Sequence, residues 1–93
     1  MSATGTTTVN FGVYPGDNIA TTTVTGQGSI LTGSNVEAFL MGDTSSDHSA
    51  YEHNMVPMRL CCGNIVASTG FDIVATCVTM KLTGNWTVRW VWA

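Results

Sequence analysis

Charged side chains are scarce in this chain of 93 residues. Only 10% of the residues are Asp, Glu, Lys or Arg, against roughly 25% in an ordinary soluble domain, while 44% are hydrophobic. A free monomer usually carries more charge to stay dispersed. We therefore expect part of the surface to be covered in an assembly.

Among the charged residues, the 3 basic ones are outnumbered by 6 acidic ones, and the net charge is −3. The three basic residues, Arg59, Lys81 and Arg89, are spread along the second half of the chain. Binding to nucleic acid depends on clustered Lys and Arg that replace the counterions of phosphates. The sequence therefore predicts no nucleic-acid partner.

Long hydrophobic runs are also missing. No stretch approaches the ~18 apolar residues of a membrane span, and the opening MSATGTTTVNFG has neither the basic nor the apolar region of a secretory signal. We expect no membrane partner and synthesis in a cytoplasm. The three cysteines, Cys61, Cys62 and Cys77, are an odd number with an adjacent pair. We interpret them as reduced, small hydrophobic residues rather than a disulfide framework.

What the chain does contain is the sequence pattern of a β protein. Short runs rich in Thr, Val and aromatic residues alternate with Gly-containing breaks, a pattern typical of strands and turns. We predict one all-β domain over residues 1–93, a small antiparallel β-sandwich or barrel of about six strands, with residues 1–8 as a flexible N-terminal arm. A turn at residues 83–85 is expected to join the last two strands as a hairpin.

The last strand, at residues 86–92, is the most informative. Trp86, Val88, Trp90 and Trp92 fall on one face of it, and an aromatic side chain buries ~150–250 Å². Core packing is expected for Trp86 and Trp90. Trp92 lies one residue from the last position given, where a lone strand usually frays. The candidates for contacts between subunits are Phe39, Trp90 and Trp92.

Residues 42–54, GDTSSDHSAYEHN, form the one long polar stretch. A loop of this length is usually functional, disordered or part of an interface. A short helical turn is expected within it, beginning near Ser46 or Asp47, because either side chain can cap the free N–H groups of a first turn. The candidate recognition residues of this loop are Asp47, His48, Tyr51, Glu52 and His53.

The same loop holds the only cluster of residue types used in metal binding. His48, His53 and Asp47 are the residues that a metal site would have to use. The two histidines are five positions apart, so they diverge on a helix and lie on opposite faces of a strand. No second ligand pair and no calcium-loop pattern accompanies them. We expect them to solvate a surface loop, and we predict no metal and no cofactor.

Catalytic signatures are absent as well. There is no G-x-S-x-G elbow, and Cys61 or Cys62 together with either histidine shows no local pattern of a catalytic cysteine. The sequence predicts that the chain is not an enzyme.

Four segments of the chain carry a resemblance to a known family. They are Val9-Asn10-Phe11-Gly12 with Pro15-Gly16; Val24-Thr25-Gly26-Gln27 with Gly33-Ser34 and Val36-Glu37-Ala38; Asp47-His48-Ser49 with Glu52-His53, Cys62-Gly63-Asn64-Ile65-Val66 and Gly70-Phe71; and Gly84-Asn85-Trp86-Thr87-Val88 with Trp90-Val91-Trp92. In these segments the chain resembles small uncharacterised proteins encoded among the structural genes of tailed bacteriophages and prophages. None of the segments is a catalytic motif.

The resemblance implies a virion or virion-associated protein. The leading hypothesis is a capsid decoration (cement) protein that forms a homo-oligomer, as such proteins commonly form trimers, and bridges subunits of the major capsid protein. The alternative is a receptor- or glycan-binding module of a tail fibre or spike, which would use the recognition residues of the loop. A third class, a metal-dependent enzyme, would use His48 and His53.

Overall fold

The computed structural model describes residues 2–93 and folds them into two three-stranded antiparallel sheets with one short helix. The elements are β1 (Ala3–Asn10), β2 (Ile19–Val24), β3 (Val36–Phe39), α1 (Ala50–Met55), β4 (Arg59–Val66), β5 (Gly70–Thr76) and β6 (Asn85–Trp92). The predictions of an all-β fold, about six strands and a short helical turn in the long loop are confirmed. Within the described part of the chain, no helix is long and apolar enough to cross a membrane.

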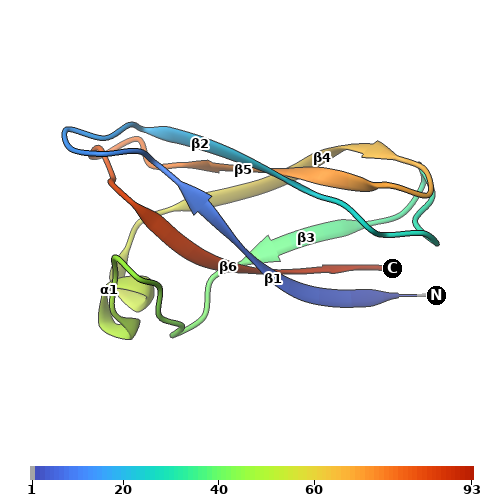
Figure 1. The fold of residues 1–93 in the computed structure, drawn as a ribbon, viewed down its shortest axis with the longest axis horizontal. Helices are drawn as coiled ribbons and strands as arrows, with labels where there is room; N and C mark the ends of the chain where they lie inside the picture. Colours follow the sequence, from blue (N-terminus) through green and yellow to red (C-terminus); the bar gives the residue numbers. More distant parts are fainter. Residues whose placement is uncertain (1) are drawn as a thin grey trace.

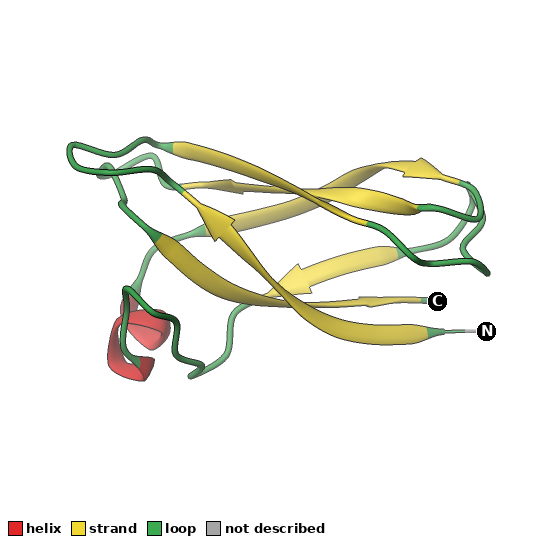
Figure 2. Cartoon of the chain, viewed as in Figure 1, coloured by secondary structure: helices red, strands yellow, loops and turns green. Residues whose placement is uncertain are grey.

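The two sheets have the strand orders β1-β6-β3 and β2-β5-β4, so β6 and β5 are the central strands. The chain changes sheet at every connection except the hairpin between β4 and β5. Figure 1 shows the sheets as the two layers of a small sandwich, with α1 below one end. Apart from α1, the described chain consists of strands and the loops that connect them (Figure 2).

The core lies between the sheets, and alternate residues of the two central strands supply its largest part. The strands and loops around them add Val9, Phe11, Ala20, Val24, Ile30 and Leu82. The inward side chains of β6 are all buried: Trp86, Val88, Trp90 and Trp92. Across the core, the other sheet contributes buried residues from β5 and from the position directly after it: Phe71, Ile73, Ala75 and Cys77. The rings of Phe71 and Trp90 meet edge to face with centroids 5.5 Å apart, an arrangement that ring quadrupoles favour.

Residues 3–8 belong to β1, and the prediction of a flexible arm is wrong for them. β1 pairs with β6 along its whole length. The arm was expected from the Thr- and Gly-rich start of the chain, but a strand of Thr and Gly keeps its full set of backbone hydrogen-bonding groups. Gly5 adds to the fit, because a Cβ there would lie 2.4 Å from the ring of Trp90. Met1, which was part of the expected arm, lies outside the described residues.

The connection between β5 and β6 is not the predicted hairpin, because the two strands lie in different sheets. It runs instead beside the connection between β1 and β2, where Asp17 and Leu82 exchange backbone hydrogen bonds of 3.0 and 2.9 Å. Gly16 makes this approach possible, since its φ is +81° and a Cβ would meet the Leu82 carbonyl oxygen at 2.0 Å. These two connections together form one end of the sandwich (Figure 1).

Candidate functional site

The long polar loop lies beside β6 at the point where β3 ends. β3 pairs only with the last residues of β6, so Asn85 and Thr87 have no strand partner on that side. Side chains of the loop bond to them instead. Asp47 Oδ2 accepts from the Asn85 N–H at 2.6 Å, and the Ser45 hydroxyl donates to the Asn85 carbonyl at 2.6 Å. His53 Nε2 accepts from the Thr87 N–H at 3.0 Å. The loop thus completes the edge of the sheet with side-chain groups.

α1 is held in place by a capping box. Ser49 is its N-cap: the Ser49 hydroxyl accepts from the Glu52 N–H at 3.2 Å, and the Glu52 carboxylate accepts from the Ser49 N–H at 2.9 Å. The prediction that Ser46 or Asp47 caps the turn is therefore wrong. Asp47 is engaged with β6 and cannot serve both purposes.

His53 is the only buried polar or charged side chain of the described residues, with 2% of its surface exposed. Its Nδ1 lies 2.8 Å from the Ser49 carbonyl oxygen, which can only accept, and its Nε2 faces the Thr87 N–H, which can only donate. These partners assign the hydrogen to Nδ1 and leave Nε2 as the acceptor, which is the neutral ring. His53 therefore fastens the start of α1 to β6.

His48 lies flat on the indole of Trp86, with ring centroids 3.7 Å apart and an interplanar angle of 16°. Its Nε2 contacts the Thr83 carbonyl, and its Nδ1 lies 3.0 Å from Glu52 Oε2. Both partners are acceptors, so both contacts are hydrogen bonds only when the ring carries two hydrogens. The hydrogen bonds of Glu52 to the Ser49 backbone and to His48 lower the pKa of its carboxyl.

Arg89 of β6 binds the other end of the loop. Its Nε and Nη2 donate to the two oxygens of Asp43 at 2.8 and 2.7 Å, the bidentate geometry that suits a guanidinium and a carboxylate. The hydrogen bond from Arg89 lowers the pKa of the Asp43 carboxyl. The pair lies on the outer face of the sheet.

These contacts give the residues predicted for recognition or metal binding separate structural roles. His48 and His53 both touch Trp86, but each bonds to different groups. In the described range 2–93, no three His, Cys, Asp or Glu side chains lie close enough to share a metal ion. Tyr51 differs from the others, because it is exposed on α1.

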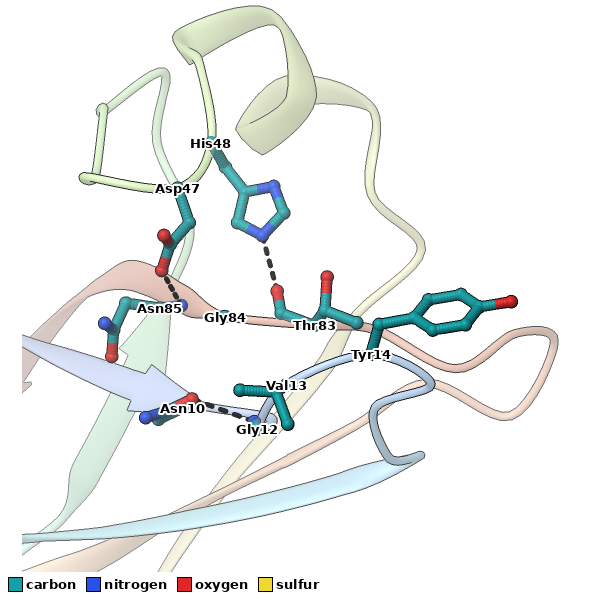
Figure 3. A pocket seen from close by; sticks show the side chains of 9 residues that line it. All are labelled: Asn10, Gly12, Val13, Tyr14, Asp47, His48, Thr83, Gly84 and Asn85. Carbon is teal, nitrogen blue, oxygen red and sulfur yellow. Dashed lines mark hydrogen bonds between the residues drawn. The ribbon is translucent and has the colours of Figure 1, made fainter.

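An open hollow of about 510 Å³ lies where the loop meets the end of the sandwich (Figure 3). Its lining residues are Asn10, Gly12, Val13, Tyr14, Asp47, His48, Thr83, Gly84 and Asn85. Only Asp47 and His48 of these were predicted site residues. Both already bond to backbone groups that line the hollow, Asp47 to Asn85 and His48 to Thr83. The ring of Tyr14 points away from the Asp47 carboxylate in Figure 3.

Exposed apolar side chains gather around this same end, and we call them the apolar end: Val13, Tyr14, Met55, Val78 and Met80. Val78 is 92% exposed and Tyr14 is 88% exposed. Met55 and Met80 line one shallow hollow with His48, and Val13 and Tyr14 line the other. The sequence held a signal for part of this surface, because Tyr14 stands next to Pro15-Gly16, and an apolar side chain in a turn serves no strand face.

The three predicted interface residues divide into two groups. Trp90 and Trp92 are 6% and 3% exposed and lie in the core of their own chain, where the Trp92 indole also donates to Gln27 Oε1 at 2.9 Å. Their prediction as subunit contacts is corrected accordingly. β6 is paired on both sides at Trp92, with β1 and with β3. Phe39, at 37% exposed on the outer face, still offers surface to a partner.

Compared with models of protein families, with curated proteins and with solved structures, the chain matches none of them.

Proposed function

We propose that this chain is a non-enzymatic structural protein of a tailed-bacteriophage virion. In its most concrete form it is a decoration (cement) protein, a homo-oligomer that binds the major capsid protein and bridges neighbouring capsid subunits. It is made in the bacterial cytoplasm and acts in the virion.

The apolar end is the observation that carries this proposal. Tyr14 and Val78 bury almost none of their surface in their own chain, and exposed apolar side chains grouped at one end of a molecule are typical of protein–protein contacts. The scarcity of charge supports the same conclusion, because few charged groups would have to be desolvated on binding. The resemblance to virion-associated proteins supplies the kind of partner.

The mechanism follows from mass action. A protein that binds only the assembled shell, and not the dissociated subunits, lowers the free energy of the assembled state by its binding free energy. In this arrangement the apolar end faces the capsid. The stiff β-sandwich transmits the contact from one capsid subunit to the next.

The test uses heads of the encoding phage that were prepared without this protein. Labelled chain should sediment with the heads and raise the temperature at which they release DNA. Val78→Asp places a charge in the apolar end without disturbing the core, and it should abolish co-sedimentation. Thr32→Asp, at an exposed position in the connection between β2 and β3, is the matched control and should bind like the natural chain. Figure 1 shows that connection at the opposite end of the sandwich. Heads that ignore the natural chain would overturn the proposal.

The hollow in Figure 3 favours a second candidate function, binding of a host glycan by a tail module. Its wall offers the side-chain amides of Asn10 and Asn85 and a carboxylate, groups that can bond to sugar hydroxyls. Titration with host polysaccharide, followed by NMR shifts, should then perturb Asn85, and Asn85→Ala should remove the response. The absence of any shift at millimolar ligand would exclude this candidate.

A further inference from the structure

The free edge of β1 is the feature from which we draw a further inference. β1 lies at the edge of its sheet and has β6 as its only strand partner. The Phe11 N–H donates to the Gly84 carbonyl just beyond the paired stretch. Because hydrogen-bonded and non-bonded residues alternate along an antiparallel ladder, Val9, Thr7, Gly5 and Ala3 direct their backbone groups to β6.

The same alternation directs the N–H and C=O groups of Thr4, Thr6 and Thr8 away from the sheet. Within residues 2–93, no backbone or side-chain group bonds to them from the outside. Their side chains are exposed on the outer face as well. The edge therefore presents three residues in succession, each with a free donor and a free acceptor.

Nothing on this edge discourages pairing with another strand. Edge strands of soluble proteins are usually blocked by charged residues, Pro, bulges or short length. β3 is four residues long and carries Glu37, and β4 carries Arg59 and a bulge between Gly63 and Val66. β2 is uncharged as well but has only six residues. β1 is the longest uncharged edge, with eight residues and no Pro.

We propose that β1 pairs edge to edge with β1 of a second copy of this chain, antiparallel about a two-fold axis at Thr6. This proposal names the self-contact of the homo-oligomer in the proposed function and rests on that function for its purpose. Thr6 faces Thr6 of the other copy, and Thr4 faces Thr8. Each of these residue pairs exchanges two backbone hydrogen bonds, and the two sheets become one continuous antiparallel sheet.

The sequence of β1 makes it a suitable partner for itself. In this register, threonine meets threonine at every position of the outer face, and such cross-strand pairs stabilise a sheet. Although each copy has a net charge of −3, no charged residue lies on β1, so no like charges face each other. A contact formed by one strand edge is at the small end of protein interfaces, below about 1,200 Å². We therefore expect a dimer that dissociates on dilution, whereas the trimer implied by the resemblance would need a different contact.

The experiment measures solution mass by light scattering over a dilution series, for the whole chain and its variants. The natural chain should form a dimer. Thr6→Lys sets two ammonium groups against each other at the axis and should raise the dimer dissociation constant at least about tenfold. Thr21→Lys, on the equally uncharged edge strand β2, is the matched control and should leave the constant unchanged. Circular dichroism should show that both variants fold.

A rescue experiment tests the axis itself. Thr6→Glu alone should also be monomeric, but mixed with Thr6→Lys it should form heterodimers, visible by native mass spectrometry. A natural chain that is monomeric or trimeric at every concentration would overturn the proposal. The proposal would also be overturned if Thr6→Lys had the same solution mass as the natural chain, or if Thr21→Lys and not Thr6→Lys raised the dimer dissociation constant. Binding to heads is measured separately. If the chain dimerises but does not bind heads, the proposed function is wrong and the β1 contact stands. If it binds heads as a monomer, the β1 contact is wrong and the proposed function stands.

Discussion

The backbone groups on the two sides of β6, which we call its β1 flank and its loop flank, find their hydrogen-bond partners in different ways. On one flank, β1 supplies an unbroken ladder of backbone hydrogen bonds. On the other, β3 covers only the last part of the strand, and side chains of the polar loop bond to the rest. Figure 1 shows where these segments lie, with β1 along β6 and the loop and α1 below.

The difference shows what a polar loop can be for. A backbone ladder needs no particular side chains, so β1 is free to be built from Thr and Gly. A side-chain ladder needs specific donors and acceptors, which accounts for Ser45, Asp47 and His53 at their positions. Residue types usual in catalytic sites therefore gather here to satisfy backbone groups of a sheet edge. The β1 flank is in turn the one left open to another molecule.

Removal of Trp92 should break both flanks together, since this residue lies opposite Ala3 of β1 and Val36 of β3. Trp92→Ala deletes a buried indole and its hydrogen bond, and should lower the free energy of unfolding by about 3–5 kcal/mol. That is most of the stability of a small domain. Urea denaturation measures the change.

Phe39→Ala is the control for that experiment, because Phe39 is partly exposed and should cost much less. If Trp92→Ala kept its stability and only changed the mass of an oligomer, the placement of Trp92 in the core of its own chain would be incorrect.

Removal of His53 should break the loop flank alone. His53→Ala leaves the Thr87 N–H without a partner and opens a cavity beside Trp86. Together these should cost about 3 kcal/mol. His48→Ala leaves the Thr83 carbonyl with the Trp86 indole N–H as a donor, and should cost less, about 1 kcal/mol. Denaturant titration of both variants measures the difference, and equal losses would show that the loop is not anchored through His53.

The sequence was most informative where one physical pattern dominates. Alternation alone placed Trp86, Val88, Trp90 and Trp92 on one face of the last strand, and all four are buried, because a strand in a two-layer sandwich must place every second residue inside. It could not predict the order of the strands, since both central strands have the same apolar alternation. For this reason the hairpin expected at residues 83–85 is wrong, and the two strands lie in different sheets.

The site was harder to predict than the fold. The spacing of Ser49 and Glu52 was a usable signal for the capping box and was missed. The roles of Asp47 and His53 could not be inferred, because they depend on where β3 stops relative to β6. The placement of Trp92 in the core depends likewise on β1 and β3 lying on either side of it.

A side chain at Gly5 should strain the β1 flank without touching the loop. The Cβ of Gly5→Ala would lie 2.4 Å from the Trp90 ring, so the indole or the strand must move. We expect a loss of about 2 kcal/mol in the free energy of unfolding. Gly28→Ala, where a Cβ has no neighbour within 4 Å, is the control. A loss no larger than that of Gly28→Ala would mean that β1 can shift away from β6.

Acid should have the smallest of these effects, and it should act on the loop side of β6 and not on the β1 side. Asp43 and Glu52 bind the loop, and hydrogen bonds from Arg89 and from the Ser49 backbone, respectively, lower their carboxyl pKa values from 3.8 and 4.5. A carboxyl whose pKa is lower in the folded state stabilises the fold above its unfolded pKa. This contribution is lost as the pH falls through the folded pKa. The loop flank should therefore loosen below about pH 4, while the β1 ladder, which has no carboxyl, should not.

Hydrogen exchange at acid pH can separate these effects by residue. The Asn85 and Thr87 amides, which bond to the loop, should lose protection before the amides of Trp86 and Val88, which face β1. Asp43→Asn and Glu52→Gln should make the loop amides less dependent on pH in this range. Asp72→Asn is the matched control, because Thr23 and Asn64 lower the pKa of Asp72 in the other sheet. If Asp72→Asn changed the loop amides as much as the loop variants do, the acid response would belong to the whole sandwich and not to one flank of β6.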